Sequence, residues 1–323
     1  MQRTEVISSV AKAEEAVSWI WTCKEQGDVV IAVDLEGVHL GKGGYATLIQ
    51  MATLKRNVFV FDIQTEPAIV SIVAPLLTSR NVVKVFHDCK ADTYALMLLG
   101  IDLVNVFDTA VAHVVIQIQE EPDKVPVVPS LNKVVELYGE GGVGTNGEKD
   151  HMKDVYRYQY DLWAVRPLTE EMLVYAAADV YCLLPHVWRN MRQRIRPQSE
   201  DLLSRMTWES MMCHISKPAV KASKRLRKKK REAQACADKI DSATSPVELD
   251  EKEVMLLHYM DLPEERLLKI KKTSFTVRTI QAIHVSRRHG DHRHLLEDLP
   301  TVTEVKREAA ILAAKPAFQL APS

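Results

Sequence analysis

The sequence has few cysteines and no long apolar run. Its 323 residues include five cysteines, an odd number, and none of them forms a CxxC pair. A disulfide framework or a zinc ribbon needs paired cysteines, so neither is expected, and a reducing compartment is the simpler interpretation. No apolar run approaches the ~20 residues that a membrane span needs. The N-terminal stretch also lacks the apolar core of a secretory signal peptide, which favours a cytoplasmic or nuclear protein that does not contact membranes.

The chain as a whole also lacks a large net charge of either sign, because its formal net charge is -1. That average conceals an asymmetry between two parts of the chain. Residues 1–200 hold 19 Lys and Arg against 26 Asp and Glu, or -7, whereas residues 201–323 hold 23 against 17, or +6. We therefore expect the two parts to contact different partners.

Short β-branched runs alternate with helical patterns over about the first 195 residues. The expected strands span residues 28–37, 44–53, 57–64, 81–88 and 102–109, and the expected helices span 66–79, 88–100, 109–119, 130–138 and 169–194. This alternation predicts an α/β domain with a mixed β-sheet and flanking helices over residues 1–197. Residues 198–323 are expected to form a basic, mainly helical C-terminal region of unknown role, with a helical pattern over 248–272.

Two carboxylates end the first long apolar run, VIAVDLEG. Because alternate side chains of a strand point to opposite faces, Asp34 and Glu36 should share one face while Leu35 packs on the other. Two like charges at one place repel each other, so a cation is expected nearby. The alternative is that they are ordinary carboxylates at the end of a strand. Asp62 and Asp108 also end strands, and we interpret both as structural caps.

Three more polar residues occur at places where an apolar residue or a simple cap would suffice. Asp92 lies in the first turn of a helix, where an aspartate often has no role beyond a favourable interaction with the helix dipole. Tyr175 and Asp179 are four residues apart, so they share one face of an otherwise apolar helix. The order along the chain is DxE on a strand, then Asp at the next strand-helix unit, then YxxxD on a late helix.

This order resembles the three exonuclease motifs of the DEDD superfamily, in its tyrosine subgroup. The matching stretches are VDLEGVHLGKGGYATLIQ, FHDCKADTYAL and LVYAAADVYCLL, and the resemblance covers roughly residues 5–195. The group includes ribonuclease D, and the first stretch is especially similar to the branch of Egalitarian and its exonuclease-domain relatives. The resemblance implies a ribonuclease H-like fold, metal binding by Asp34, Glu36, Asp92 and Asp179, and a role for Tyr175 in positioning the attacking water.

The chemistry explains why such a site uses carboxylates. Hydrolysis of a phosphodiester develops negative charge on several oxygens, which two divalent ions can stabilise together. Mg²⁺ and Mn²⁺ prefer hard oxygen ligands over imidazole or thiolate. We expect Asp34 to bridge two such ions, Glu36 and Asp179 to complete one ion site, and Asp92 to support the other.

Other residues are candidates for contacting nucleic acid. Gly37 would let the backbone approach a nucleotide closely, and Leu35 and His87 flank the same motifs. Residues 217–231 include nine Lys and Arg, which could bind phosphates without selecting sequence, act as a nuclear localisation signal or form a solvated helix. The candidate phosphate ligands among them are Lys224, Arg225, Arg227, Lys228, Lys229, Lys230 and Arg231.

Three functions remain open at this stage. The complete set of five motif residues favours a metal-dependent 3′-5′ exonuclease that acts on the 3′ ends of single-stranded RNA and uses two Mg²⁺ or Mn²⁺ ions. A non-catalytic RNA-binding adaptor of the Egalitarian type is the first alternative. A DNA 3′-5′ exonuclease is the second, because no residue identifies a contact with the 2′-OH. Whichever function holds, the C-terminal region is a candidate for binding a protein partner.

Overall fold

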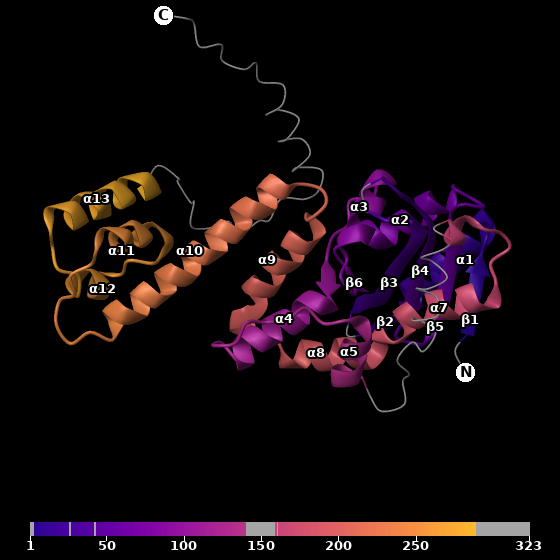
Figure 1. The fold of residues 1–323 in the computed structure, drawn as a ribbon, viewed down its shortest axis with the longest axis horizontal. Coiled ribbons are helices and arrows are strands. Elements are labelled where there is room, and N and C mark those ends of the chain that lie inside the picture. The colour runs from indigo at the N-terminus through magenta and orange to yellow at the C-terminus, as the bar shows by residue number, and fades with distance from the viewer. Residues whose placement is uncertain (1–2, 26, 42, 140–158, 160, 289–323) are drawn as a thin grey trace, which may run out of the picture. The chain divides into compact units, whose positions relative to one another are not determined.

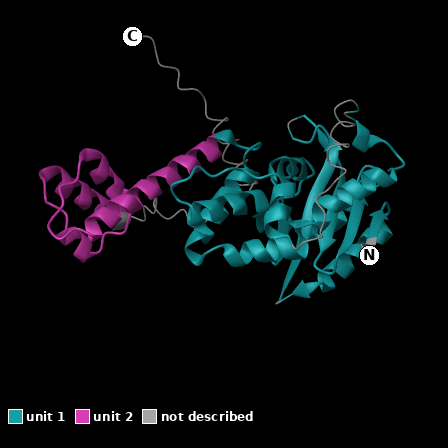
Figure 2. Cartoon of the chain, turned by 60° about the horizontal axis from the view of Figure 1, so that its bottom comes forward, with its two compact units in different colours: residues 1–217, 300–323 teal, residues 218–299 magenta. Residues whose placement is uncertain are grey.

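The computed structural model describes residues 3–25, 27–41, 43–139, 159 and 161–288 (Figure 1). These residues form two compact units, one that ends at Lys217 and one that begins at Pro218 (Figure 2). The first unit continues past Pro197, because helix α9 (Glu200–Met211) packs against the helices of the sheet layer. The division into domains at residues 197 and 198 stays a prediction.

Among the described residues, a seven-stranded mixed sheet forms the centre of the first unit. Its strands are β1 (Arg3–Ile7), β2 (Lys24–Glu25), β3 (Asp28–Val38), β4 (Tyr45–Thr53), β5 (Asn57–Asp62), β6 (Val82–Phe86) and β7 (Val106–Asp108). The order is β1-β5-β4-β3-β6-β7, with β2 paired to β3. Strand β4 is antiparallel to β3 and β5, whereas β6 is parallel to β3. The expected α/β class with a mixed sheet is confirmed, and β1 and β2 are additions.

Helices cover both faces of this sheet. One face packs against α1 (Val10–Thr22), α2 (Ile69–Thr78) and α3 (Lys90–Leu98), and the other packs against α4 (Thr109–Glu120), α5 (Leu131–Tyr138), α7 (Glu170–Tyr181) and α8 (Trp188–Arg194). Strand β3 contributes to both cores, because Ala32 faces the second group of helices while Ile31 and Val33 face the first. A central strand buried on both sides explains the nearly continuous apolar run before Asp34.

The expected single helix over residues 169–194 is wrong. Helix α7 ends at Tyr181 and α8 begins at Trp188, and between them Leu184 adopts an extended backbone with φ -123° and ψ 146°. The next residue, Pro185, disfavours helical geometry at the residue before it and lacks an N–H donor. The periodic apolar pattern continues through the break because both helices bury one face in the same core.

The second unit is helical, as expected. It consists of α10 (Lys217–Asp241), α11 (Glu251–Leu256), α12 (Glu264–Leu268) and α13 (Ser274–Arg288). Ala233, Ala237 and Ile240 lie on one face of α10 and pack with α11 in a separate small core. The helical pattern over 248–272 is interrupted near Pro263, which precedes α12. Within the described residues, no helix combines the length and apolar character that a membrane crossing requires.

Candidate metal centre

Strand β3 carries Asp34 and Glu36 on the same face of the sheet. Val33 and Leu35 alternate with them and are 1% and 3% exposed on the opposite face, within the core under α1, α2 and α3. Asp34 and Glu36 are half-buried. The alternation expected from the sequence is therefore present, and both carboxylates lie where β3 is covered by α7.

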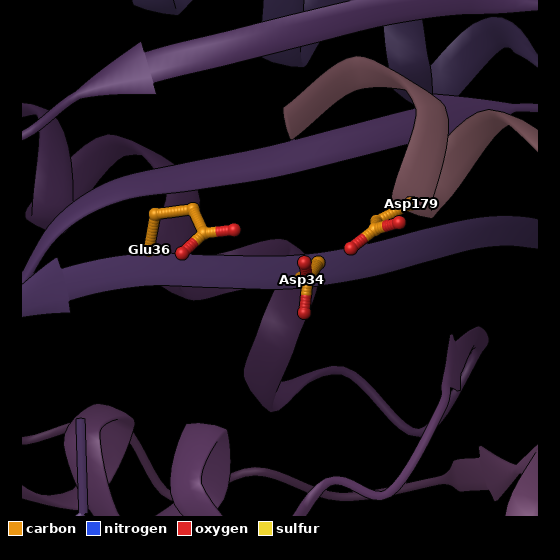
Figure 3. A group of neighbouring side chains, drawn as sticks. All are labelled: Asp34, Glu36 and Asp179. Carbon is orange, nitrogen blue, oxygen red and sulfur yellow. The ribbon is translucent and has the colours of Figure 1, made fainter. Parts of the chain in front are cut away.

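Helix α7 brings Asp179 to the same place. Thr169 caps the start of this helix by accepting a hydrogen bond from the N–H of Met172 over 3.3 Å. Asp179, 8% exposed, lies further along the helix and faces β3. One carboxylate oxygen from each of Asp34, Glu36 and Asp179 lies within 4.8 Å of the other two (Figure 3).

This proximity has an electrostatic cost. Two unit charges 4.8 Å apart repel each other by ~3 kcal/mol at an effective dielectric constant of ~20. Three such pairs would oppose folding if nothing compensated them. Half-buried carboxylates that converge in this way are a donor set that suits a hard divalent cation, because Mg²⁺ and Mn²⁺ take oxygen ligands.

Asp92 lies beside this group and is not part of it. The residue is in the first turn of α3 and is 6% exposed, and its Oδ1 accepts a hydrogen bond from the N–H of Leu35 over 3.2 Å. Burial raises the pKa of Asp92 to about 7, an effect that backbone hydrogen bonds oppose and that the charges of Asp108 and Asp88 reinforce. Asp92 thus ties α3 to β3 between the two strand carboxylates.

Tyr175 lies close enough to the three carboxylates for their charges to act on its hydroxyl. Burial raises the pKa of Tyr175 far above its usual value, and the negative charges of Asp179, Glu36 and Asp34 raise it further. The phenol therefore stays protonated and can donate a hydrogen bond. Its ring lies against Trp163, with the ring centroids 5.9 Å apart.

Two strand-end aspartates that we interpreted as caps do have structural roles. Asp108 begins α4, accepts hydrogen bonds from Ala110 and Val111, and also accepts one from the buried Ser210 hydroxyl over 3.0 Å. Asp62 accepts two hydrogen bonds from Thr65 and a bidentate pair from Arg166.

Sequence reasoning missed Arg166. Its guanidinium lies 2.7 Å from each Asp62 oxygen and also donates to the carbonyl of Trp163. Burial raises the pKa of Asp62, but the hydrogen bonds from Arg166 and Thr65 lower it more, so its net pKa is below the usual value. This pair holds the segment before α7 and thereby the ring that packs on Tyr175.

Gln50 was also missed. It is 0% exposed in β4, and neither Nε2 nor Oε1 of its amide has a hydrogen-bond partner within the part of the chain that the structure describes. Burying such groups without partners costs ~1–3 kcal/mol each. The available signal was a glutamine within the apolar run TLIQMAT.

The other candidates for contacting nucleic acid have less direct support. The Leu35 side chain is buried in the core, so it is not available to a strand of nucleic acid. A Cβ on Gly37 would lie 2.1 Å from the carbonyl oxygen of Tyr45, so close packing of β4 already requires glycine there. His87 Nδ1 lies 2.9 Å from the Thr109 hydroxyl.

The basic residues of α10 lie in the second unit. Lys224, Arg225 and Arg231 are exposed, whereas Lys229 donates to the hydroxyl of Tyr259 over 3.0 Å. A solvated helix and a phosphate-binding helix both fit these contacts.

A family model described as 3′-5′ exonuclease matches residues 5–196, which include all five motif residues. The chain belongs to the 3′-5′ exonuclease family. The chain is 30% identical over 199 residues to exosome complex component 10 of Rattus norvegicus, an alignment that covers 61% of this chain and 19% of that protein. It is 24% identical over 207 residues to the Egalitarian protein homolog of Caenorhabditis elegans, covering 60% of this chain and 34% of that protein.

A solved structure supports the same placement. RNase D of Trypanosoma brucei matches this chain with a TM-score of 0.52 and 25% identity, covering 65% of this chain and 72% of that one. The same protein in complex with RNA U12 matches with a TM-score of 0.50. The resemblance to the ribonuclease D-like superfamily is thus confirmed. The chain spans about a fifth of the length of the exosome relative.

Proposed function

We propose that this exonuclease removes nucleotides from the 3′ end of single-stranded RNA and depends on divalent metal ions. The observation that carries the proposal is the convergence of Asp34, Glu36 and Asp179 to within 4.8 Å of one another. A divalent cation would offset the repulsion among these three carboxylates, and hydrolysis of a phosphodiester is a reaction that such cations assist.

The residues have separate roles in the proposed reaction. Asp34, Glu36 and Asp179 would hold one Mg²⁺ or Mn²⁺ ion, and Asp34 together with Asp92 would hold a second. When bound, the ions stabilise negative charge on the phosphodiester and make water more acidic. The protonated hydroxyl of Tyr175 donates a hydrogen bond that orients the attacking water.

Support for RNA as the substrate comes from the relatives. RNase D of T. brucei is solved with RNA U12, and its sequence is 25% identical to the exonuclease over the matched region. The exposed cations of α10 are candidates for contacting RNA phosphates. Oligonucleotides of one sequence, made as RNA and as DNA, would separate the proposal from a DNA exonuclease.

The test compares Asp34→Asn with the wild-type protein on a 3′-labelled single-stranded RNA. We expect wild type to shorten the RNA only with Mg²⁺ or Mn²⁺, and Asp34→Asn to bind the RNA but to shorten it at least ~100-fold more slowly. The matched control is Asp28→Asn, which changes an exposed aspartate at the start of the same strand. Trimming in excess chelator, or undiminished trimming by Asp34→Asn, would contradict the proposed centre.

The similarity to the C. elegans Egalitarian homolog supports a second candidate, an RNA-binding adaptor that does not hydrolyse its ligand. Wild type would then bind RNA tightly without releasing nucleotides in either metal, on single-stranded and duplex substrates alike. The same assay measures binding and release in parallel, so it distinguishes the two functions.

A further inference from the structure

Gln50 is an exception in the core of the first unit. Its neighbours on the same face of β4, Leu48 and Ala52, are apolar, and all three are 0–1% exposed. The Gln50 amide carries two donor hydrogens and an acceptor oxygen, yet neither polar atom has a hydrogen-bond partner among the described residues. Because a methionine or leucine would fill this position without unpaired polar atoms, the fold by itself does not explain a glutamine here.

The position of Gln50 relates it to the candidate metal centre. In the antiparallel ladder, Gln50 lies directly opposite Asp34 on β3 and opposite Val60 on β5. Residues paired in this way point to the same face, with Cβ atoms about 4.5–5.5 Å apart. A glutamine side chain is long enough to reach a carboxylate across that separation.

Helix α7 packs against the face of β4 that carries Gln50. Leu48 and Ala52 belong to the same core as Ala176, Ala177 and Val180 of α7. This helix also carries Tyr175 and Asp179, so Gln50 lies on the face of the sheet that the carboxylates share.

We propose that Gln50 is a positioning residue for the metal centre, whose Nε2–H donates to the Asp34 carboxylate when that carboxylate holds a cation. The inference rests on the proposed function. A carboxylate has about four acceptor positions, more than two cations use, and a neutral donor can fix its orientation without adding charge. If the Gln50 amide forms this hydrogen bond only when the metal is bound, its polar atoms have no partner in the metal-free protein.

The proposal predicts effects of opposite sign on stability and on metal affinity. Gln50→Met keeps a side chain of similar length with no branch at Cβ or Cγ and removes both polar atoms. In excess chelator, the variant should unfold at a higher urea concentration than wild type, because no unpaired amide remains buried. In titrations with Mn²⁺ followed by electron paramagnetic resonance, its dissociation constant should rise ~10-fold, the effect expected for loss of a group that orients a ligand.

Three further variants serve as a repeat and as controls for the urea unfolding and the Mn²⁺ titration. Gln50→Leu repeats the test with a different shape, in case the methionine packs badly. Met51→Leu is the matched control, because it conserves volume on the same strand but on the opposite face, and should leave Mn²⁺ affinity unchanged. Asp34→Asn should abolish binding and so reports on the centre itself.

Each outcome decides one question. A lower urea midpoint in chelator for both Gln50 variants would show that the amide stabilises the fold, and would overturn the inference. A higher midpoint with unchanged Mn²⁺ affinity would overturn the positioning role while leaving the metal centre intact. Absence of Mn²⁺ binding by wild type would refute the proposed function, and the inference with it.

Discussion

Buried polar residues of this chain differ in the partners that offset the free-energy cost of burying them. Asp62 is 3% exposed and has a guanidinium and a hydroxyl as partners. Asp92 is 6% exposed and accepts a backbone N–H. Lys84, in β6, is 0% exposed on the same face as Val82 and Phe86, and its Nζ donates to the carbonyl of Ser79 over 2.6 Å. This partner is a neutral carbonyl, which does not balance the ammonium charge, and burial lowers the pKa of Lys84 to about 7.

Lys84 should therefore make stability depend on pH. The pKa of a lysine in the unfolded chain is ~10.4, well above the folded value of about 7. Between these values the unfolded chain binds more protons, so the free energy of unfolding rises with pH, by at most ~1.4 kcal/mol per pH unit from this group. Lys84→Met removes the titrating group, so its advantage over wild type should be largest below pH 7 and shrink as the pH rises.

The measurement is urea unfolding of wild type and Lys84→Met at several pH values from about 6 to about 8.5, which bracket the lowered pKa. Other titrating groups are shared by the two proteins and cancel in the difference. Parallel curves over this range would show that Lys84 does not titrate below its usual pKa. Lys55→Met, which changes a lysine at a turn between β4 and β5, serves as the control.

At the scale of elements, the site depends on how α7 is held against β3, β4 and β5. The segment before α7 is fixed by the Asp62–Arg166 pair and by the Gln64 side chain, which donates to the carbonyl of Ala164 over 2.8 Å. The ring of Trp163, in the same segment, packs on Tyr175. The Asp62–Arg166 pair thus connects the end of β5 to the helix that carries two of the five motif residues.

Arg166→Met should weaken this connection. It leaves the Asp62 carboxylate, 5% exposed in its side chain, without its cation, and breaking a buried pair in this way costs ~3 kcal/mol. We expect the free energy of unfolding, measured in urea at neutral pH, to fall by about that amount. Adding Asp62→Asn should recover part of the loss, because the two residues are coupled.

A surface ion pair provides the control for the Asp62–Arg166 pair. Arg189 contacts Glu25, but their side chains are 41% and 36% exposed. Arg189→Met should lower the free energy of unfolding by less than ~1 kcal/mol. Similar losses for the Arg166 and Arg189 variants would contradict the importance given to the buried pair.

At the scale of the whole molecule, charge is divided along the chain. The carboxylate centre belongs to a part of the chain with a net charge of -7, whereas residues 201–323 carry +6. An acidic site needs a local cation to accept a polyanion, and the exposed cations of the basic segment are candidates for binding phosphates.

This division predicts a specific salt dependence of RNA binding. Replacing the exposed Lys224, Arg225 and Arg231 by Gln should weaken RNA binding. It should also reduce the slope of the logarithm of the binding constant against the logarithm of salt concentration by ~2. Each phosphate that a cation neutralises on a single strand adds ~0.7 to the magnitude of that slope. Fluorescence anisotropy at several salt concentrations measures it. A control with Lys12, Lys124 and Lys133 changed to Gln removes the same charge from the first unit, and an equal change in slope there would contradict a specific role for α10.

Sequence alone determined the local arrangement of the motif residues. Alternation along a strand places Asp34 and Glu36 on one face, and a spacing of four places Tyr175 and Asp179 on one face of α7. The composition and the alternating patterns also indicated the α/β class. These features depend on neighbours a few residues away, so they can be read from the chain without its fold.

The family resemblance implied that the four carboxylates lie together, but only the tertiary structure decided how distant residues meet. Three contacts join segments that are far apart in sequence or lie on different strands. They are the convergence of Asp179 with the carboxylates of β3 to within 4.8 Å, the hydrogen bond from the backbone of Leu35 to Asp92, and the position of Gln50 opposite Asp34. The break before α8 was hidden by an apolar pattern that both helices share. Strand register and helix packing set these contacts through long-range burial, which periodicity in the sequence does not encode.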